Sequence, residues 1–349
     1  MRFVIRADGA PEIGGRHIMR CLTLAEEAAL RGHDITFVVG EGPMIERVRE
    51  AGHSVVPLPS LRHSPERFPP HAHWLSAPWD VDATVTSGVI AQTGANWLIW
   101  DHYGLDARWV KKQRSVKGDL KVLALDDLDD RSLGSDLVLD PARLGSAKRN
   151  YPVQTALNGP DFALLRPEFA ALRPASLAKR GKVLLRRVLI APGLMDSAGL
   201  APMALLAIAD LGLDAEVVMG ASSQSLAEVQ SLIKLNKNWT LTLDAKDMGQ
   251  RMLEADLCIG AAGGTSWERC CMGLPSVVIA VAENQEAGIV ALDTAGAAIT
   301  MSRTGLRSDV LARQVLKAME TAKDLSDRAA SLCDGQGAKR VMDYVENCS

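Results

Sequence analysis

The chain alternates short runs of apolar residues with longer stretches in which apolar positions recur every three or four residues. Short apolar runs bounded by polar turns are typical of strands in a parallel sheet, and the longer period is typical of helices that pack against it. In the first half of the chain the predicted strands are 3–5, 35–39, 97–100, 122–125 and 137–139. In the second half they are 188–191, 216–219, 241–243, 257–259 and 277–280.

This alternation predicts an α/β protein with two Rossmann-like, doubly wound domains that face a central cleft. A length of 349 residues also favours two domains. We place the first at 1–155 and the second at 156–330, and we expect the mostly helical stretch 331–349 to pack back on the first domain. Ligands of such sheets bind beyond the carboxyl ends of the strands, so the residues after each strand are the candidates for function.

Charge and cysteine content narrow the class of protein. Lysine and arginine total 39 against 42 acidic residues, a formal charge of −3, which argues against a nucleic-acid-binding protein. The six cysteines form no C-x-x-C pair and lie mostly in apolar patterns, as reduced thiols do. Arg6 and Asp8 interrupt the first apolar run, and no later run is long enough to span a membrane. We therefore expect a cytoplasmic protein without membrane insertion.

The most informative segment is LCIGAAGGTSWERCCMGLP at 257–275, which reads as a buried strand, a glycine-rich turn and a short helix. Gly260, Gly263 and Gly264 would allow positive φ and close approach of a ligand, while Thr265 or Ser266 would cap the helix. Free N–H groups at such a helix start favour a phosphate. The segment matches neither the P-loop nor the dinucleotide fingerprint, and a plain tight turn is the alternative.

His17 is the candidate base. It follows the turn Gly14–Gly15 and opens the first long helix, at the carboxyl edge of the first sheet. A helix N-terminus lowers the pKa of a histidine, which favours the neutral form that accepts a proton. The alternative is a histidine that only packs or caps at the helix start.

Polar residues also follow two other strands of the first domain. Asp101 and Tyr103 come after the strand 97–100 and are placed to bind a sugar or to orient His17. Asp126 and Asp127 follow the next strand, where solvated acidic turns are common, and we predict no metal site. His63, His71 and His73 lie in the proline-rich loop at 60–80, which lacks the further ligands that zinc requires.

In the second domain, Glu283, Asn284 and Gln285 follow the strand 277–280, one crossover after the glycine-rich turn. A carboxylate there can accept hydrogen bonds from ribose hydroxyls, and amides can recognise a base edge or a sugar. An ordinary polar turn is the alternative.

Five motifs in order give the chain a family resemblance over nearly its whole length. They are RADGAPEIGGRHIMRCLTLAEE, WDHYGLDARW, LDDLDDR, GPDFALLRPEF and GAAGGTSWERCCMGLPS followed by ENQ. With these motifs the chain resembles the UDP-2,4-diacetamido-2,4,6-trideoxy-β-L-altropyranose hydrolases of pseudaminic acid biosynthesis. That family is similar in fold to the MurG-type GT-B glycosyltransferases, so the resemblance implies a GT-B-like fold.

The resemblance implies a cytoplasmic enzyme that needs no metal or other cofactor and releases UDP and the free sugar from a UDP-sugar. His17 would activate water for attack at the anomeric carbon with inversion, and the glycine-rich helix start would hold the diphosphate. The residues expected to bind the sugar are Asp8, Gly14, Gly15, Arg20, Asp101 and Tyr103. Those expected to bind UDP are Gly263, Gly264, Thr265, Ser266, Glu268, Glu283, Asn284 and Gln285.

Two positions depart from the family pattern. Arg16 stands where the turn G-x-G-H has glycine, and Leu194 stands where a glycine is expected in the first turn of the second domain. Two alternatives therefore accompany the hydrolase. One is a GT-B glycosyltransferase with a non-water acceptor, and the other is a UDP-sugar-binding paralogue without turnover. Besides the UDP-sugar, partner enzymes of the same pathway are possible, and the sequence leaves the oligomeric state open.

Overall fold

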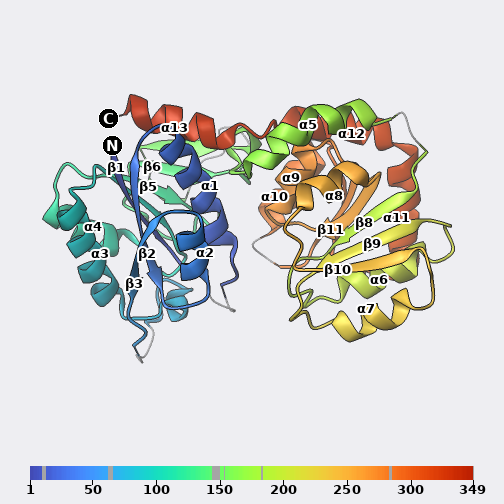
Figure 1. Ribbon diagram of the computed structural model, residues 1–349, viewed down its shortest axis with the longest axis horizontal. Coiled ribbons are helices and arrows are strands. Elements are labelled where there is room, and N and C mark those ends of the chain that lie inside the picture. Colours follow the sequence, from blue (N-terminus) through green and yellow to red (C-terminus); the bar gives the residue numbers. More distant parts are fainter. Residues whose placement is uncertain are drawn as a thin grey trace. The chain divides into compact units, whose positions relative to one another are not determined.

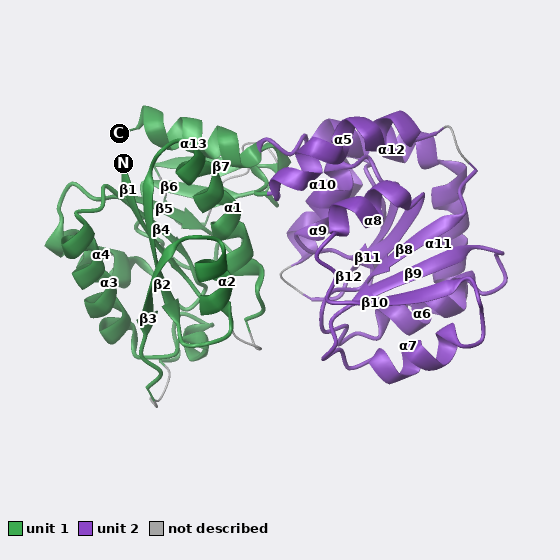
Figure 2. Cartoon of the chain, in the orientation of Figure 1, with its two compact units in different colours: residues 1–164, 337–349 green, residues 165–336 purple. Residues whose placement is uncertain are grey.

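The structure is a computed structural model, and it describes residues 1–9, 13–61, 66–143, 150–152, 154–181, 184–282 and 285–348. Two compact units divide the chain, and Figure 2 colours them separately. Unit 1 comprises Met1–Leu164 and Gly337–Ser349, and unit 2 comprises Leu165–Gln336. The boundary after Leu164 lies later than the one placed at 155, because a strand and a short 3-10 helix still belong to unit 1.

Unit 1 is built on a seven-stranded parallel sheet (Figure 1). Its strands are β1 (Arg2–Ala7), β2 (Asp34–Gly40), β3 (Ser54–Leu58), β4 (Trp97–Asp101), β5 (Lys121–Leu125), β6 (Leu137–Asp140) and β7 (Thr155–Asn158). Its helices are α1 (Arg16–Leu30), α2 (Met44–Glu50), α3 (Trp79–Thr93), α4 (Ala107–Val116) and α13 (Gly337–Asn347), with 3-10 turns η1 (Ala72–Trp74) and η2 (Pro160–Phe162). The strand order is β3-β2-β1-β4-β5-β6-β7.

Alternation along the strands gives the sheet two buried faces. In β1, Phe3, Ile5 and Ala7 join the core under α1, α2 and α13, whereas Val4 joins the core under α3 and α4. Successive side chains of a strand point to opposite faces, so continuous apolar runs are what such a sheet requires. Helix α1 ends before Gly32, whose φ of 77° is left-handed and costs a glycine little.

Unit 2 holds a six-stranded parallel sheet in the order β10-β9-β8-β11-β12-β13. Its strands are β8 (Arg187–Ala191), β9 (Asp214–Met219), β10 (Trp239–Leu243), β11 (Leu257–Ala261), β12 (Ser276–Ala280) and β13 (Ile299–Ser302). Its helices are α5 (Pro167–Lys179), α6 (Leu200–Ile208), α7 (Leu226–Ile233), α8 (Met248–Glu254), α9 (Thr265–Cys271), α10 (Glu286–Thr294), α11 (Ser308–Glu320) and α12 (Ala322–Leu332). The predicted α/β class with two parallel sheets is confirmed.

The C-terminal helix α13 belongs to unit 1. Val341, Met342 and Val345 are buried in the same core as α1, and Arg31 at the end of α1 pairs with Asp343 and Glu346 at 2.7 and 2.8 Å. The stretch 322–336, by contrast, lies in unit 2 (Figure 2).

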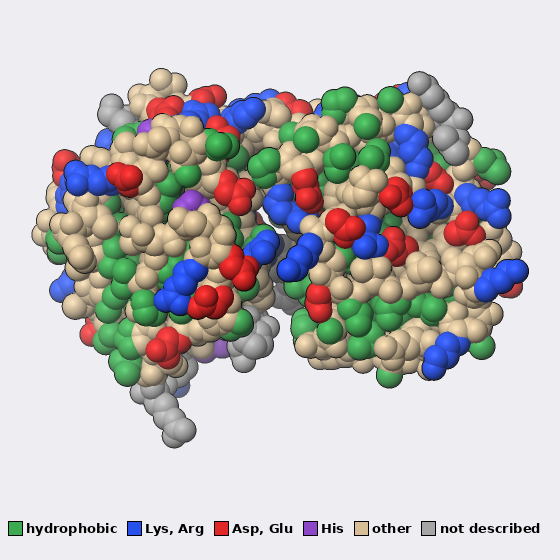
Figure 3. All heavy atoms as spheres, in the orientation of Figure 1, with side chains coloured by type: hydrophobic (Ala, Val, Ile, Leu, Met, Phe, Trp, Pro, Cys, Tyr) green, Lys and Arg blue, Asp and Glu red, His purple; other side chains and the backbone are tan. Residues whose placement is uncertain are grey.

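The molecular surface carries both signs of charge. On the face shown in Figure 3, lysine and arginine side chains are interspersed with acidic ones on each unit. Among the described residues no helix is long and apolar enough to cross a membrane.

Candidate active site

The strand order of each sheet reverses at one point, between β1 and β4 in unit 1 and between β8 and β11 in unit 2. At a reversal the two crossovers leave on opposite faces of the sheet, which opens a crevice at the carboxyl ends of the two strands. Ala7 and Asp101 are paired at the ends of β1 and β4, so the side chains that follow them share this crevice.

His17 and Asp101 meet at the crevice of unit 1. His17 Nδ1 lies 2.5 Å from Asp101 Oδ1, and the two side chains are 3% and 0% exposed. Arg20, one turn further along α1, donates from Nη2 to Asp101 Oδ1 at 2.6 Å and from Nε to Oδ2. Arg20 fixes the carboxylate of Asp101, which accepts the Nδ1–H of His17. The lone pair of the imidazole is then on Nε2. This atom has no hydrogen-bond partner among the described residues.

The charges around this pair set its protonation. Burial lowers the pKa of His17 below its usual 6.5; Asp101 opposes this shift, and Arg20 and Arg16 add to it. Burial alone would raise the pKa of Asp101, but the positive charge of Arg20 holds it well below its usual range. The pair is therefore a neutral imidazole beside a carboxylate at neutral pH, which is the state a general base requires.

Tyr103 connects this pair to Asp127. The Tyr103 ring stands edge-on to the ring of His17, with centroids 4.8 Å apart, and its hydroxyl donates to Asp127 and accepts from Arg16. Arg16 Nη2 also lies 3.3 Å from Asp127 Oδ2. Although burial opposes it, the charges of Arg16 and Arg20 lower the pKa of Asp127 to about 2. Arg16, which departs from the family pattern, is thus tied to Asp127.

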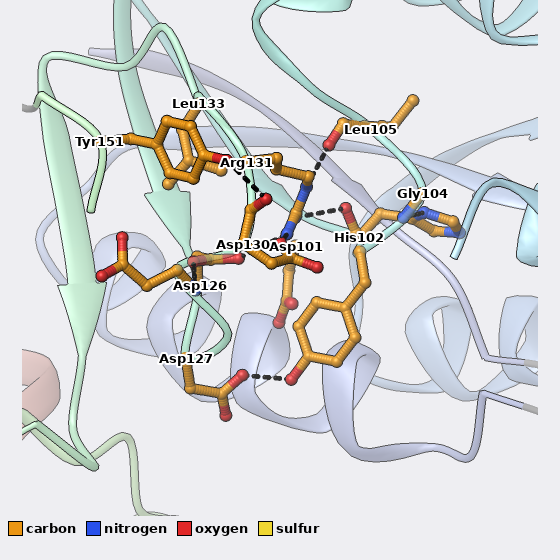
Figure 4. A network of polar contacts seen from close by, with 12 residues as sticks. Asp101, His102, Gly104, Leu105, Asp126, Asp127, Asp130, Arg131, Leu133 and Tyr151 are labelled. Atoms are coloured by element: carbon orange, nitrogen blue, oxygen red, sulfur yellow. Dashed lines mark hydrogen bonds and ion pairs between the residues drawn. The ribbon is translucent and has the colours of Figure 1, made fainter. Parts of the chain in front are cut away.

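Asp126 holds the loop after β5 through the contacts drawn in Figure 4. It lies 2.9 Å from Arg131 and accepts from the backbone N–H of Asp129 at 3.0 Å. Arg131 donates onward to the carbonyls of Leu105 and His102, so it joins the loop after β4 to the loop after β5 (Figure 4). Asp126 and Asp127 therefore both face arginine side chains in this structure.

Asp8 lies in a separate buried network. Arg6 donates to both of its oxygens at 2.5 and 2.8 Å and also to Asp82, and the backbone N–H of Gly40 donates to Asp8 at 2.7 Å. These contacts join the ends of β1 and β2 to α3. The structure thus gives Asp8 the contacts of a structural carboxylate and does not bring it into hydrogen-bond contact with His17 or Asp101.

The turn before α1 explains the two glycines expected there. Gly14 has a φ of 74°, which disfavours any other residue, and Gly15 is the N-cap of α1 without a side-chain cap. This backbone sets His17 in the first turn of the helix.

The glycine-rich turn of unit 2 lies at the reversal between β8 and β11, but it differs from the expectation in detail. Gly260, Gly263 and Gly264 do not have positive φ. A side chain at Gly260 would meet Arg269 and the carbonyl of Ala191 within 3 Å, whereas Gly263 and Gly264 face open space. Glycine at 260 therefore permits close packing against Arg269 and Ala191, and glycine at 263 and 264 leaves the backbone exposed.

The predicted hydroxyl caps are also wrong. The N-cap of α9 is Gly264, and no side chain caps the helix. Ser266 is buried, and its hydroxyl instead accepts from Arg269 Nη2 at 2.9 Å. Arg269 also donates to the carbonyl of Ala261 at 2.9 Å and so supports the turn from beneath. The N–H groups of Gly264 and Thr265 donate to none of the described residues, which leaves them available to a ligand.

The other turn at this reversal lies between β8 and α6, and among the described residues it has no free N–H donor at the helix start. Asp196 accepts from the N–H groups of Leu200 and Ala201 at 2.8 and 3.0 Å, and Pro202 has no N–H to offer. A carboxylate thus takes the position that an anion would occupy. The sequence analysis missed this role of Asp196.

Glu268 lies one turn into α9. Its nearest cation is Arg166, at 3.9 Å, and its Oε2 is buried without a hydrogen-bond partner among the described residues. Burial raises the pKa of Glu268 to about 7, although Arg166 and Arg269 oppose the shift. An unpartnered carboxyl oxygen beside an uncapped helix start is a candidate contact for ligand hydroxyls.

Of the three residues expected after β12, Glu283 and Asn284 lie outside the described residues. Gln285 is the N-cap of α10, and its Oε1 accepts from the N–H of Val281 at 2.9 Å. The structure thus places Gln285 at a turn, where it closes the loop between β12 and α10.

Comparison with known proteins finds similarity to a glycosyltransferase domain and to a polysaccharide biosynthesis protein. Residues 204–345 match the model of the glycosyltransferase family 28 C-terminal domain. The chain is 26% identical over 263 residues to the spore coat polysaccharide biosynthesis protein SpsG of Bacillus subtilis (strain 168), covering 72% of this chain and 76% of that protein.

Solved structures extend the likeness to the whole chain. MurG of Acinetobacter baumannii is similar with a TM-score of 0.72 at 14% identity, over 99% of both chains. The chain has the GT-B fold. Spinosyn rhamnosyltransferase SpnG, solved with thymidine diphosphate, is similar with a TM-score of 0.61 at 16% identity, over 98% of this chain and 100% of that one. The predicted GT-B-like fold class is thereby confirmed.

Proposed function

We propose that this GT-B protein is a UDP-sugar hydrolase with His17 as its general base. The observation that carries the proposal is the buried pair His17–Asp101, fixed by Arg20, with Nε2 of the imidazole left without a partner among the described residues. His17, Arg20 and Asp101 lie in the motifs through which the chain resembles the UDP-2,4-diacetamido-2,4,6-trideoxy-β-L-altropyranose hydrolases. This resemblance supports that UDP-sugar as the substrate, in pseudaminic acid biosynthesis.

The chemistry divides between the two units. His17 Nε2 takes a proton from water, and the water oxygen bonds to the anomeric carbon. The bond from that carbon to the diphosphate oxygen breaks, UDP leaves with the electron pair, and the configuration inverts. Asp101 holds the imidazole in the required tautomer and stabilises the imidazolium that forms. No metal or other cofactor is part of this proposal.

UDP is assigned to unit 2. The free N–H groups of Gly264 and Thr265 would bind the diphosphate, whose charge grows as the bond breaks. Glu268 Oε2, which lacks a partner among the described residues, would accept from a hydroxyl of the nucleotide. The match of residues 204–345 to a glycosyltransferase C-terminal domain and the thymidine diphosphate in the similar SpnG structure support a nucleoside diphosphate in this unit.

A glycosyltransferase with a non-water acceptor is the second candidate. The observation in its favour is the same match to glycosyltransferase family 28. A base that deprotonates water would deprotonate a sugar hydroxyl equally well, so the two candidates differ only in the nucleophile.

The deciding experiment follows UDP release and the free sugar by NMR, with the UDP-linked 2,4-diacetamido-2,4,6-trideoxy-altrose as substrate and EDTA present. Wild type should release both, and His17→Ala should be slower by about 10²–10⁴-fold. Because the pKa of His17 is lowered, the acidic limb of wild-type kcat/KM should lie below pH 6.5. UDP binding without release would reject the hydrolase, and release only after a carbohydrate acceptor is added would select the transferase.

A further inference from the structure

A group of aromatic rings beside His17 is not used by the proton transfer. The centroid of the Tyr103 ring lies 5.7 Å from that of Trp74 and 5.6 Å from that of His71, and the rings of His71 and Trp74 are 4.5 Å apart. We call His71, Trp74 and Tyr103 the aromatic wall. Tyr103 is buried, whereas His71 and Trp74 are half-buried and keep exposed surface.

The loop around η1 that carries His71 and Trp74 is anchored on its inner side. Ala72 and Leu75 are buried, and Leu75 packs in the core under α3 and α4. A side chain at Gly104 would lie 2.7 Å from the carbonyl oxygen of His71, so glycine allows the loop to reach the end of β4.

Glu66, at the start of this loop, makes two further contacts that hold it. It accepts from Trp79 Nε1 at 2.9 Å and pairs with Arg108 at 2.8 Å. Together with the buried Ala72 and Leu75, these contacts attach the loop that carries His71 and Trp74 to α3 and α4, and such attachment reduces the entropy lost on binding.

We propose that the aromatic wall binds one face of the sugar ring of the substrate and that Trp74 is its specificity-determining residue. This rests on the proposed function, which brings the anomeric carbon to His17, at the end of the wall. The carboxylates closest to His17 are engaged by Arg16 and Arg20, so hydroxyl recognition by them is limited. Aromatic faces bind the C–H face of a sugar and its apolar substituents, and the half-exposed Trp74 offers the largest such face of the wall.

The test separates sugar recognition from nucleotide binding. KM is measured for the UDP-linked diacetamido altrose, with UDP-N-acetylglucosamine and UDP-glucose as comparison substrates, and the Kd of UDP is measured by calorimetry. Trp74→Ala should raise KM for the preferred substrate about tenfold and reduce its preference over the other two. Trp74→Phe keeps an aromatic face, so its KM and its substrate preference should be close to those of wild type. The Kd of UDP should not change.

Arg67→Ala is the matched control, because Arg67 is exposed in the loop that leads to the 3-10 turn and makes no ring contact with the wall among the described residues. If Trp74→Ala is poorly folded, Trp74→Leu fills the site without an aromatic face and replaces it. If the Trp74 variants turn over substrate with an unchanged KM, the proposal that the aromatic wall binds the sugar is wrong, whereas the proposed hydrolase activity still stands. Failure of wild type to bind UDP would overturn the proposed function itself.

Discussion

The two strand-order reversals of this protein have the same topology and opposite chemistry. At the reversal of unit 1, the donors and acceptors are side chains, and Asp101, Arg20 and His17 hold one another in a buried network. At the reversal of unit 2, the donors are backbone N–H groups of an uncapped turn. A proton acceptor needs neighbours that set its pKa, whereas a diphosphate needs donors that lose no entropy when it binds.

A second contrast lies within unit 2. Both turns at its reversal lead into a helix, but Asp196 caps α6, while α9 starts without a side-chain cap. Under the proposed function, the diphosphate therefore has one open helix start in unit 2, because the carboxylate of Asp196 occupies the other.

The largest expected effect concerns unit 1. Asp101→Asn keeps the shape of the side chain but removes the charge that orients His17 and stabilises its protonated form. We expect a loss of about 10²–10³-fold in kcat with little change in UDP affinity. The measurement is single-turnover UDP release together with calorimetric titration of UDP. Equal losses in kcat and in UDP affinity would show that the two reversals do not have separate tasks.

The next effect concerns Glu268 and is a pH dependence of stability. Its folded pKa of about 7 is above the usual 4.5, so the folded state holds a proton that the unfolded state has lost between these values. This stabilisation is present below pH 4.5 and is lost as the pH rises through 7, by up to about 3 kcal/mol.

The check is chemical unfolding of the ligand-free protein between pH 5 and pH 8. Glu268→Gln should remove this part of the pH dependence, and the exposed Glu228→Gln should leave it as in wild type. An identical pH dependence in Glu268→Gln and wild type would show that Glu268 is not a neutral acid below pH 7.

The smallest effect tests the contrast between the two turns of unit 2. Asp196→Ala removes the cap of α6 and should lower the free energy of unfolding by about 1–2 kcal/mol without weakening UDP binding. Urea unfolding and calorimetry measure the two quantities, with the exposed Asp210→Ala as control. A marked loss of UDP affinity would mean that the turn between β8 and α6 belongs to the nucleotide site.

The sequence predicted the central strands of both sheets and one edge strand, β10, but missed the other three edge strands. The three strands without a prediction are β3, β7 and β13, and each lies at the edge of its sheet. Their residues are mostly half-buried or exposed, and Pro57 interrupts β3. These three edge strands lack the continuous apolar run that a central parallel strand needs, so the pattern that identified β1 or β11 is absent there.

The sequence predicted where the candidate site lies better than it predicted the contacts of the individual residues. The rule that ligands bind after the strands led to His17, Asp101 and Tyr103, which the structure brings together. The same rule could not separate Asp8 from the site residues, because the sequence does not reveal that Arg6 engages Asp8 together with the distant Asp82. The glycine-rich turn was located for reasons that proved partly wrong, since close packing with Arg269 depends on contacts that no local pattern reveals.

Helix α13 also has a consequence for how the protein is made on the ribosome. The core of unit 1 includes Val341, Met342 and Val345, while unit 2 is one uninterrupted stretch from Leu165 to Gln336. During synthesis the whole of unit 2 emerges and can fold while one flank of α1 still exposes apolar surface. The unit that begins first is therefore completed last, and a nascent chain halted before residue 337 would carry a finished unit 2 and an unfinished unit 1.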